Sequence, residues 1–157
     1  MQKITPFLWF DKQAEEAMNF YVSIFKNAKV LSINRYGKGA PLPEGTVLTA
    51  SFELNGLKFV ALNGGPLYKF SPATSFVVDC DTQEEVDYYW EKLGDGGTYN
   101  QCAWLDDKFG VTWQIVPKQL GELLGNPDPA CVGRVMQAMM QMQKIDIAGL
   151  QRACDGN

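Results

Sequence analysis

The chain has no histidine among its 157 residues. This absence excludes hydrolases whose serine or cysteine nucleophile is activated by an imidazole base, and every metal site that needs a histidine ligand. General acid–base catalysis near neutral pH would have to use a carboxylate, lysine, tyrosine or cysteine with a shifted pKa. The sequence therefore disfavours hydrolytic and metal-dependent catalysis.

Positive charge and long apolar runs are also scarce. The 14 Lys and Arg residues are outnumbered by 18 Asp and Glu residues, which gives a net charge of −4. A nucleic-acid-binding protein needs a basic face, so we expect no nucleic-acid partner. No apolar run approaches the roughly 20 residues that cross a bilayer, and no apolar signal-peptide region begins the chain. We expect a soluble cytoplasmic protein without a membrane partner.

Cysteine is present four times, as Cys80, Cys102, Cys131 and Cys154. No two of them form a Cys-x-x-Cys pair, which excludes a zinc ribbon and a thioredoxin-like motif. We expect four free thiols in a reducing compartment.

The chain contains an internal repeat. When Ala14 is omitted, residues 11–24 align with residues 81–93. The matched apolar residues are Ala17, Phe20, Tyr21 and Ile24 in the first copy and Val86, Tyr89, Trp90 and Leu93 in the second. Their i, i+3, i+4, i+7 spacing predicts an amphipathic helix in each copy. Asp81 is expected to cap the second helix, with Glu84 three residues on.

Strand-like segments surround each predicted helix. Residues 4–10 and 74–79 precede the helices, and the Asn55-Gly56 and Phe109-Gly110 pairs predict hairpin turns before further strands. Each half is thus β-α-β-β-β. We predict an α+β fold in one domain, residues 1–157, with modules of about 1–65 and 73–117.

Residues 118–157 are predicted to form a C-terminal helical segment. Asp128-Pro129 is typical of a helix start, and Asp146 is expected to cap a last short helix. The first of these helices carries a Met-rich stripe that includes Met136, Met139 and Met140. Such a stripe forms a ligand surface in some proteins, and core or subunit contacts in more of them.

The two modules resemble the vicinal oxygen chelate superfamily, which includes glyoxalase I and bleomycin-resistance proteins, and its PhnB-like branch in particular. The segments that carry the resemblance are residues 5–10, 14–21, 59–65, 101–117 and 144–148. The resemblance implies a homodimer, with ligand cavities where modules pair. Members of this branch often carry the name 3-demethylubiquinone-9 3-methyltransferase.

Metal-using relatives place one ligand on the first strand and one on the last strand of each module. The resemblance puts these positions at Ile4, Val60, Thr74 and Gln114. Ile and Val have no donor atom and a neutral Thr is a poor ligand, so we expect no metal and no glyoxalase-type isomerisation. The glycine-rich residues 94–97 follow a helix and precede a strand, which is the wrong context for a nucleotide cradle. We expect no cofactor.

Strand alternation places Thr112, Gln114 and Val116 on one sheet face. The corresponding face of the first module carries Lys58 and Val60. Gln114 is interpreted either as a structural amide or as a group that orients a ligand, and Lys58 is either a pocket residue or a solvated charge. The predicted ligand-binding residues are Gln114, Thr74, Gln101, Trp104 and Lys58.

Three neighbouring residues have simpler interpretations. Asp106 and Asp107 are interpreted as turn residues rather than as paired catalytic carboxylates. Cys102 would act as a nucleophile only beside a cation or a helix start, and no such partner is evident in the sequence. None of the three is therefore predicted to be catalytic.

These observations support a metal-independent protein that binds a small apolar or aromatic molecule in a sheet-lined cavity. The alternative is an enzyme of unassigned reaction, such as the methyl transfer in the family name, with Gln114, Thr74 and Gln101 orienting the substrate. A third hypothesis is an interaction module whose cavity is filled by Trp104, Phe76 and their neighbours.

Overall fold

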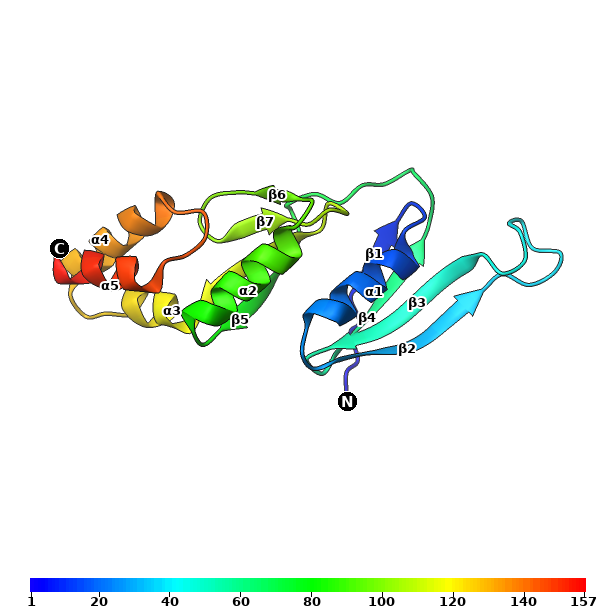
Figure 1. Ribbon diagram of the computed structural model, residues 1–157, viewed down its shortest axis with the longest axis horizontal. Helices are drawn as coiled ribbons and strands as arrows, with labels where there is room; N and C mark the ends of the chain where they lie inside the picture. The colour runs from blue at the N-terminus through cyan, green and yellow to red at the C-terminus, as the bar shows by residue number, and fades with distance from the viewer. The chain divides into compact units, whose positions relative to one another are not determined.

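The computed structural model describes residues 1–157, which form two compact units, Met1–Phe70 and Ser71–Asn157. Each unit has one four-stranded mixed sheet with a helix against it (Figure 1). The predicted α+β fold of two β-α-β-β-β modules with C-terminal helices is confirmed. None of the helices combines the length and the apolar character needed to cross a membrane.

The first unit contains one helix and four strands. Its elements are β1 (Phe7–Phe10), α1 (Ala14–Ile24), β2 (Ala28–Arg35), β3 (Val47–Leu54) and β4 (Leu57–Asn63). The sheet order is β1-β4-β3-β2, with β1 parallel to β4 and the other pairs antiparallel. Tyr21 of α1 stacks on Phe52 with ring centroids 6.0 Å apart, and Phe52 stacks on Phe59 at 5.5 Å. The core therefore lies between α1 and one sheet face.

The hairpin between β3 and β4 forms at the predicted Asn55-Gly56 pair. Both residues adopt the left-handed backbone conformation, with φ values of 49° and 82°, and Leu54 pairs directly with Leu57. Left-handed residues at both central positions match the twist of the flanking strands, which explains this two-residue turn.

The second unit repeats this topology. Its first five elements are β5 (Ser75–Cys80), α2 (Gln83–Gly94), β6 (Thr98–Tyr99), β7 (Trp104–Asp106) and β8 (Thr112–Pro117). The sheet order is β5-β8-β7-β6, and β5 is parallel to β8. All four apolar residues predicted for the α2 stripe are buried, so the predicted helix is confirmed.

The cap of α2 differs from the prediction by one residue. Thr82, not Asp81, is the N-cap, and its hydroxyl accepts a hydrogen bond from the Glu85 backbone at 3.2 Å. The Glu85 carboxylate in turn accepts from the Asp81 backbone N–H at 2.7 Å. Thr82 and Glu85 therefore form a capping box, which satisfies two backbone donors.

Asp107 organises the turn between β7 and β8. Its side chain is 3% exposed, and it accepts hydrogen bonds from the backbone N–H groups of Phe109 and Val111 at 2.9 and 3.0 Å. Its second oxygen accepts from the Trp113 indole at 2.9 Å. Asp107 is a turn residue, as predicted, but it is also a buried anchor for β8.

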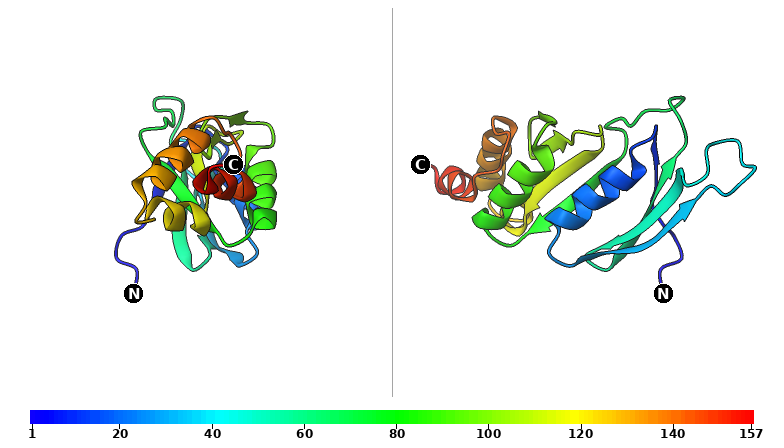
Figure 2. Two further views of the ribbon diagram at one scale, coloured as in Figure 1. Left: turned by 90° about the vertical axis from the view of Figure 1, so that its left-hand side faces the viewer. Right: turned by 45° about the vertical axis from the view of Figure 1, so that its right-hand side comes forward.

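Three C-terminal helices complete the second unit, namely α3 (Lys118–Leu124), α4 (Pro129–Met140) and α5 (Ile147–Asp155). Asp128 caps α4 as predicted, since its carboxylate accepts from the Ala130 backbone at 3.0 Å. Helices α4 and α5 lie side by side (Figure 2). Met139 packs against the apolar cluster between these helices, whereas Met136 and Met140 are exposed. The predicted Met stripe is thus split between core and surface.

The expectation of four free thiols is wrong for one pair. Cys131 of α4 and Cys154 of α5 form a disulfide, while Cys80 and Cys102 are free. The two bonded cysteines are 23 residues apart and meet only because α4 packs on α5. No local spacing motif therefore predicts the bond.

The α4–α5 loop (residues 141–146) is attached to the β6–β7 connection. Its carbonyl groups at Met142 and Gln143 accept hydrogen bonds from the Cys102 and Ala103 backbone N–H groups at 2.8 and 3.0 Å. Cys102 and Ala103 have φ values of 59° and 78°, which non-glycine residues adopt only when their surroundings hold them. The loop is also held to α2, because Lys144 pairs with Asp87 at 3.0 Å.

Candidate functional site

The second sheet has one covered face and one open face. Trp113 and Ile115 of β8 are buried on the α2 side. Because side chains alternate along a strand, Gln114 and Val116 lie on the opposite face, away from α2. Val116 packs against the apolar cluster of the C-terminal helices, whereas Gln114 lies beside the exposed Val77. The predicted facing of these residues is confirmed, and the open face is the candidate site.

Gln114 lies in the middle of a row, which here means the side chains that pair in register across neighbouring strands on this face. Its register partners are Val77 of β5 and Trp104 of β7, and such neighbours are about 5 Å apart. Val77 is 53% exposed, which is unusual for a strand residue of this size. The row thus offers an aliphatic group, an amide and an aromatic ring to one side of the sheet.

The Gln114 amide is held by one hydrogen bond, from Nε2 to the Ser75 hydroxyl at 2.9 Å. A hydroxyl donates as well as accepts, so the amide can turn over and keep this bond. Gln114 can therefore present either its carbonyl oxygen or its NH₂ group to a ligand.

Asp106 lies in the next row, where it pairs with Thr112, which in turn pairs with Ser75. The Thr112 hydroxyl donates to its carboxylate at 2.6 Å, and the Asn100 amide donates at 3.3 Å. The interpretation of Asp106 as a turn residue is wrong, because β7 continues through it. Period-two alternation from Trp104 would have placed Asp106 on this face.

The corresponding row of the first unit has a different chemistry. Val60 pairs with Phe7 on one side and with Ser51 on the other. Phe7 is 58% exposed. Lys58 lies near this row, and its backbone exchanges two hydrogen bonds of 2.9 Å with the Gln2 side chain. The first module therefore has no amide equivalent to Gln114.

Two of the positions implied by the resemblance lie outside the strands. Val60 and Gln114 face Phe7 and Val77 in the parallel pairs, so Ile4 and Thr74 precede their strands and do not share these rows. Ile4 is 86% exposed. Apolar content predicts a strand but cannot set the register of two parallel strands, which explains both shifts.

Gln101 and Thr74 are exposed residues just outside the open-face rows. Gln101 is in the turn that precedes Cys102, and its carbonyl accepts from the Trp104 backbone at 3.2 Å. Thr74 directly precedes β5. Their binding roles stay predictions, as do those of Gln114, Trp104 and Lys58.

The residues of these two rows do not suit a divalent cation. The two rows supply the side chains of Phe7, Val60, Val77 and Gln114, of which only the amide has a donor atom. The structure has no group of three or more His, Cys, Asp or Glu residues that could hold a metal ion. A divalent cation needs several converging oxygen or nitrogen ligands, so one amide is insufficient.

The glycine-rich segment after α2 does not suit a nucleotide cofactor either. α2 ends at Gly94, and the Gly97 backbone N–H donates to the Gly94 carbonyl at 2.9 Å, which closes a turn. A Cβ atom on Gly97 would lie 2.0 Å from the Asp106 carbonyl oxygen. This glycine is therefore required by close packing against β7.

The free thiol nearest in sequence to this sheet's first helix is not a candidate nucleophile. The free thiol Cys80 is buried, and burial, together with nearby Glu85, Asp79 and Asp81, raises its pKa to about 12. A thiol with this pKa is protonated at neutral pH and is a weak nucleophile.

Comparisons with known proteins agree with this architecture. The family model described as 3-demethylubiquinone-9 3-methyltransferase matches residues 2–116. The chain belongs to this family. A PhnB protein from Bacillus cereus that carries the same name is 41% identical, with a TM-score of 0.68, and the match covers 74% of this chain and 99% of that one. The chain is thus a PhnB-like member of the vicinal oxygen chelate superfamily, as the sequence segments indicate.

More distant solved structures share the fold of this PhnB-like chain. A Pseudomonas aeruginosa protein is 19% identical with a TM-score of 0.62, covering 74% of this chain and 98% of that one. The fosfomycin resistance protein FosX from Listeria monocytogenes is 20% identical with a TM-score of 0.59, covering 80% and 98%. A comparison with the curated proteins gives no match.

Proposed function

We propose that this PhnB-like protein binds a small, largely apolar or aromatic molecule on the open face of the second sheet, without a metal ion. The observation that supports this most directly is the row of Val77, Gln114 and Trp104, in which one adaptable amide lies between an exposed aliphatic group and a half-buried aromatic ring. Small-molecule sites are mostly apolar, with a few polar groups that fix orientation.

Asp106 determines how a ligand would be oriented in the proposed site. Its carboxylate lies one row from Gln114 and is held by Thr112 and Asn100. A ligand hydroxyl or N–H group is therefore favoured near Asp106, while its ring lies against Trp104 and Val77. A ligand anion is disfavoured there by repulsion from the carboxylate.

The first experiment is native mass spectrometry of gently purified protein, which reports a retained molecule, any metal and the oligomeric state together. We expect a retained organic molecule, no metal and a homodimer. One manganese, nickel or zinc ion retained per chain would contradict the metal-independent part of the proposal.

The second experiment is Gln114→Leu, with Val60→Leu as the matched control in the first module. In ¹⁵N-labelled protein, 1-naphthol should shift the Gln114 side-chain NH₂ resonances, and Gln114→Leu should weaken binding several-fold, as loss of one hydrogen bond typically does. Val60→Leu should bind as the wild type does. If Gln114→Leu instead lowers stability strongly and leaves binding unchanged, Gln114 is a structural amide.

The family name favours a second candidate, which is methyl transfer to a demethylubiquinone-like substrate. Under this hypothesis Gln114, Thr74 and Gln101 orient the substrate. Equilibrium binding of S-adenosylmethionine to the purified protein would support it, and the absence of binding at millimolar concentration would leave the binding function as the better account.

A further inference from the structure

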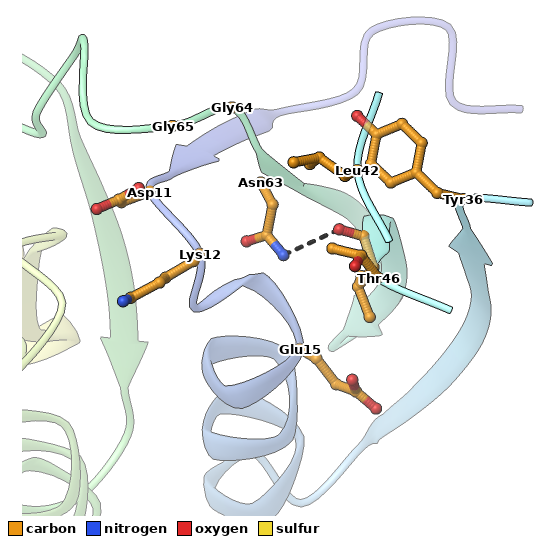
Figure 3. A pocket seen from close by; sticks show the side chains of 10 residues that line it. Asp11, Lys12, Glu15, Tyr36, Leu42, Thr46, Asn63, Gly64 and Gly65 are labelled. Carbon is orange, nitrogen blue, oxygen red and sulfur yellow. Dashed lines mark hydrogen bonds between the residues drawn. The ribbon is translucent and has the colours of Figure 1, made fainter. Parts of the chain in front are cut away.

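A separate cavity of about 510 Å³ lies in the first unit (Figure 3). It is formed by the β1–α1 connection, the end of β4, and the loop between β2 and β3. Its volume is within the range of about 300–1,000 Å³ that is usual for small-molecule sites. All of its lining residues belong to Met1–Phe70.

The floor of the cavity is preformed. The Asn63 side chain accepts a hydrogen bond from the Ala14 backbone N–H at 2.8 Å and donates to the Val47 carbonyl at 3.1 Å, so both ends of its amide are fixed. The backbone N–H groups of Gly64 and Gly65 are bonded to the carbonyls of Phe10 and Asp11 at 2.8 and 3.1 Å. A rigid floor lowers the entropic cost of binding.

The two sides of the cavity differ in polarity. Figure 3 shows Tyr36 and Leu42 side by side, on the other side of Asn63 from Asp11 and Lys12. Leu42 is 46% exposed, so its side chain is available to an apolar group of a ligand. The cavity therefore has an aromatic and aliphatic wall on one side of Asn63 and a charged wall on the other, where the exposed Asp11 and Lys12 side chains extend outward at its rim.

The charged wall holds two unpaired charges of opposite sign. The third charged lining residue, Glu15, is ion-paired with Arg35 at 3.2 Å, whereas Asp11 and Lys12 form no ion pair. Lys12 also precedes the N-terminal end of α1, where the helix dipole adds positive potential. A carboxylate and an ammonium group on adjacent residues complement a ligand that carries both charges.

We propose that this cavity binds a zwitterion of the amino-acid type with an apolar side chain. The ligand's ammonium group pairs with Asp11, its carboxylate pairs with Lys12, and its side chain packs against Tyr36 and Leu42. This site is independent of the one on the second sheet, and either site can exist without the other.

The test uses L-phenylalanine as the probe and ¹⁵N-labelled full-length protein. We expect chemical-shift changes at the backbone amides of Gly64, Gly65 and Thr46, and none at the Gln114 side chain. N-acetyl-L-phenylalanine lacks the ammonium group, L-phenylalanine methyl ester lacks the carboxylate, and glycine lacks the apolar group. Each of the three should bind about tenfold more weakly, the usual effect of losing one charge-assisted or apolar contact.

Two variants identify the partner of each charge. Asp11→Asn should weaken L-phenylalanine binding about tenfold but leave N-acetyl-L-phenylalanine binding unchanged. Lys12→Gln should weaken L-phenylalanine binding and leave the methyl ester unaffected. Asp81→Asn, at the repeat equivalent of Asp11, and Lys26→Gln, beyond the other end of α1, are the controls and should bind normally.

Three outcomes would overturn the proposal. They are no shift at the cavity amides at millimolar L-phenylalanine, equal affinities for the free and blocked compounds, and a shift confined to the Gln114 side chain. All four substitutions are at exposed positions, and preserved amide spectra of the free variants verify their folds.

Discussion

The two modules have the same topology but close their last hairpins by different means. The first uses the exposed two-residue Asn55-Gly56 turn, which has no buried carboxylate at its centre. The second uses a five-residue turn, residues 107–111, organised by the buried Asp107 carboxylate. The second module also depends on the α4–α5 loop to hold its β6–β7 connection. The comparison indicates that the second module relies more on long-range contacts than the first does.

The largest expected difference comes from the two turns. Asp107→Ala leaves three donors without their acceptor, two of them on the buried residues Val111 and Trp113, and should lower stability by about 3–5 kcal/mol. Asn55→Ala affects an exposed left-handed residue and should cost only about 1 kcal/mol.

Urea unfolding followed by tryptophan fluorescence measures both changes, because Trp90, Trp104 and Trp113 belong to the second unit and only Trp9 to the first. Asp107→Asn keeps one acceptor oxygen and should fall between the wild type and Asp107→Ala. Equal losses for Asp107→Ala and Asn55→Ala would refute the difference between the modules.

Removal of the disulfide should have the next largest effect, and only on the second unit. The bond closes a loop with a sequence separation of 23 residues. The chain-entropy argument assigns such a loop about 3 kcal/mol. Dithiothreitol should therefore lower the urea midpoint of the second unit, while the first unit, which has no cysteine, should not change.

The double variant Cys131→Ala with Cys154→Ala is the control, since its midpoint should not respond to dithiothreitol. Alkylation of the folded wild type should modify Cys102 and spare the buried Cys80, whose raised pKa keeps it a thiol. Alkylation of Cys131 or Cys154 without a reductant would show that the bond is absent.

The smallest effect is expected from pH. Hydrogen bonds from Gln83 and Lys144 lower the pKa of Asp87 below its usual 3.8. The group is ionised in the folded state down to a lower pH than in the unfolded state, so its stabilising contribution is complete above the unfolded pKa and disappears as pH falls through the folded pKa. Asp87 is partly exposed, and we expect less than about 1 kcal/mol.

Hydrogen exchange at the Cys102 and Ala103 amides is the measurement for this prediction, because these donors bind the loop that carries Lys144. At pH 7, Asp87→Asn should speed their exchange relative to the wild type. At a pH below the folded pKa of Asp87, the two proteins should exchange alike. A difference that persists there would show that the ion pair is not responsible.

Local sequence signals predicted the elements and the repeat well. The Asn55-Gly56 turn, the Asp128 cap and the apolar stripe of α2 each depend on neighbouring residues, and each is present in the structure. The same holds for the alternation that places Gln114 opposite Trp113. These features are encoded over a few residues, so a single sequence contains the information.

Features that depend on distant contacts were missed. The disulfide, the parallel register that pairs Val77 with Gln114, and the strand position of Asp106 all require knowledge of which segments pack together. The cavity beside Asp11 is formed by three separate segments and has no motif in the sequence. The candidate sites were therefore only partly predictable, although the fold was largely so.

The hydrogen bonds from Cys102 and Ala103 to Met142 and Gln143 affect the order in which the protein can fold during synthesis. The match to the family model ends at residue 116. The two acceptors, Met142 and Gln143, each lie 40 residues after their donors and therefore beyond the matched segment. Residues 1–70 can fold while the ribosome is still adding the rest, because all their partners have been made. The β6–β7 connection gains its two partners only when the α4–α5 loop emerges. A ribosome stalled after residue 117 would therefore display a complete first module beside a second module whose β6–β7 connection lacks these two hydrogen bonds.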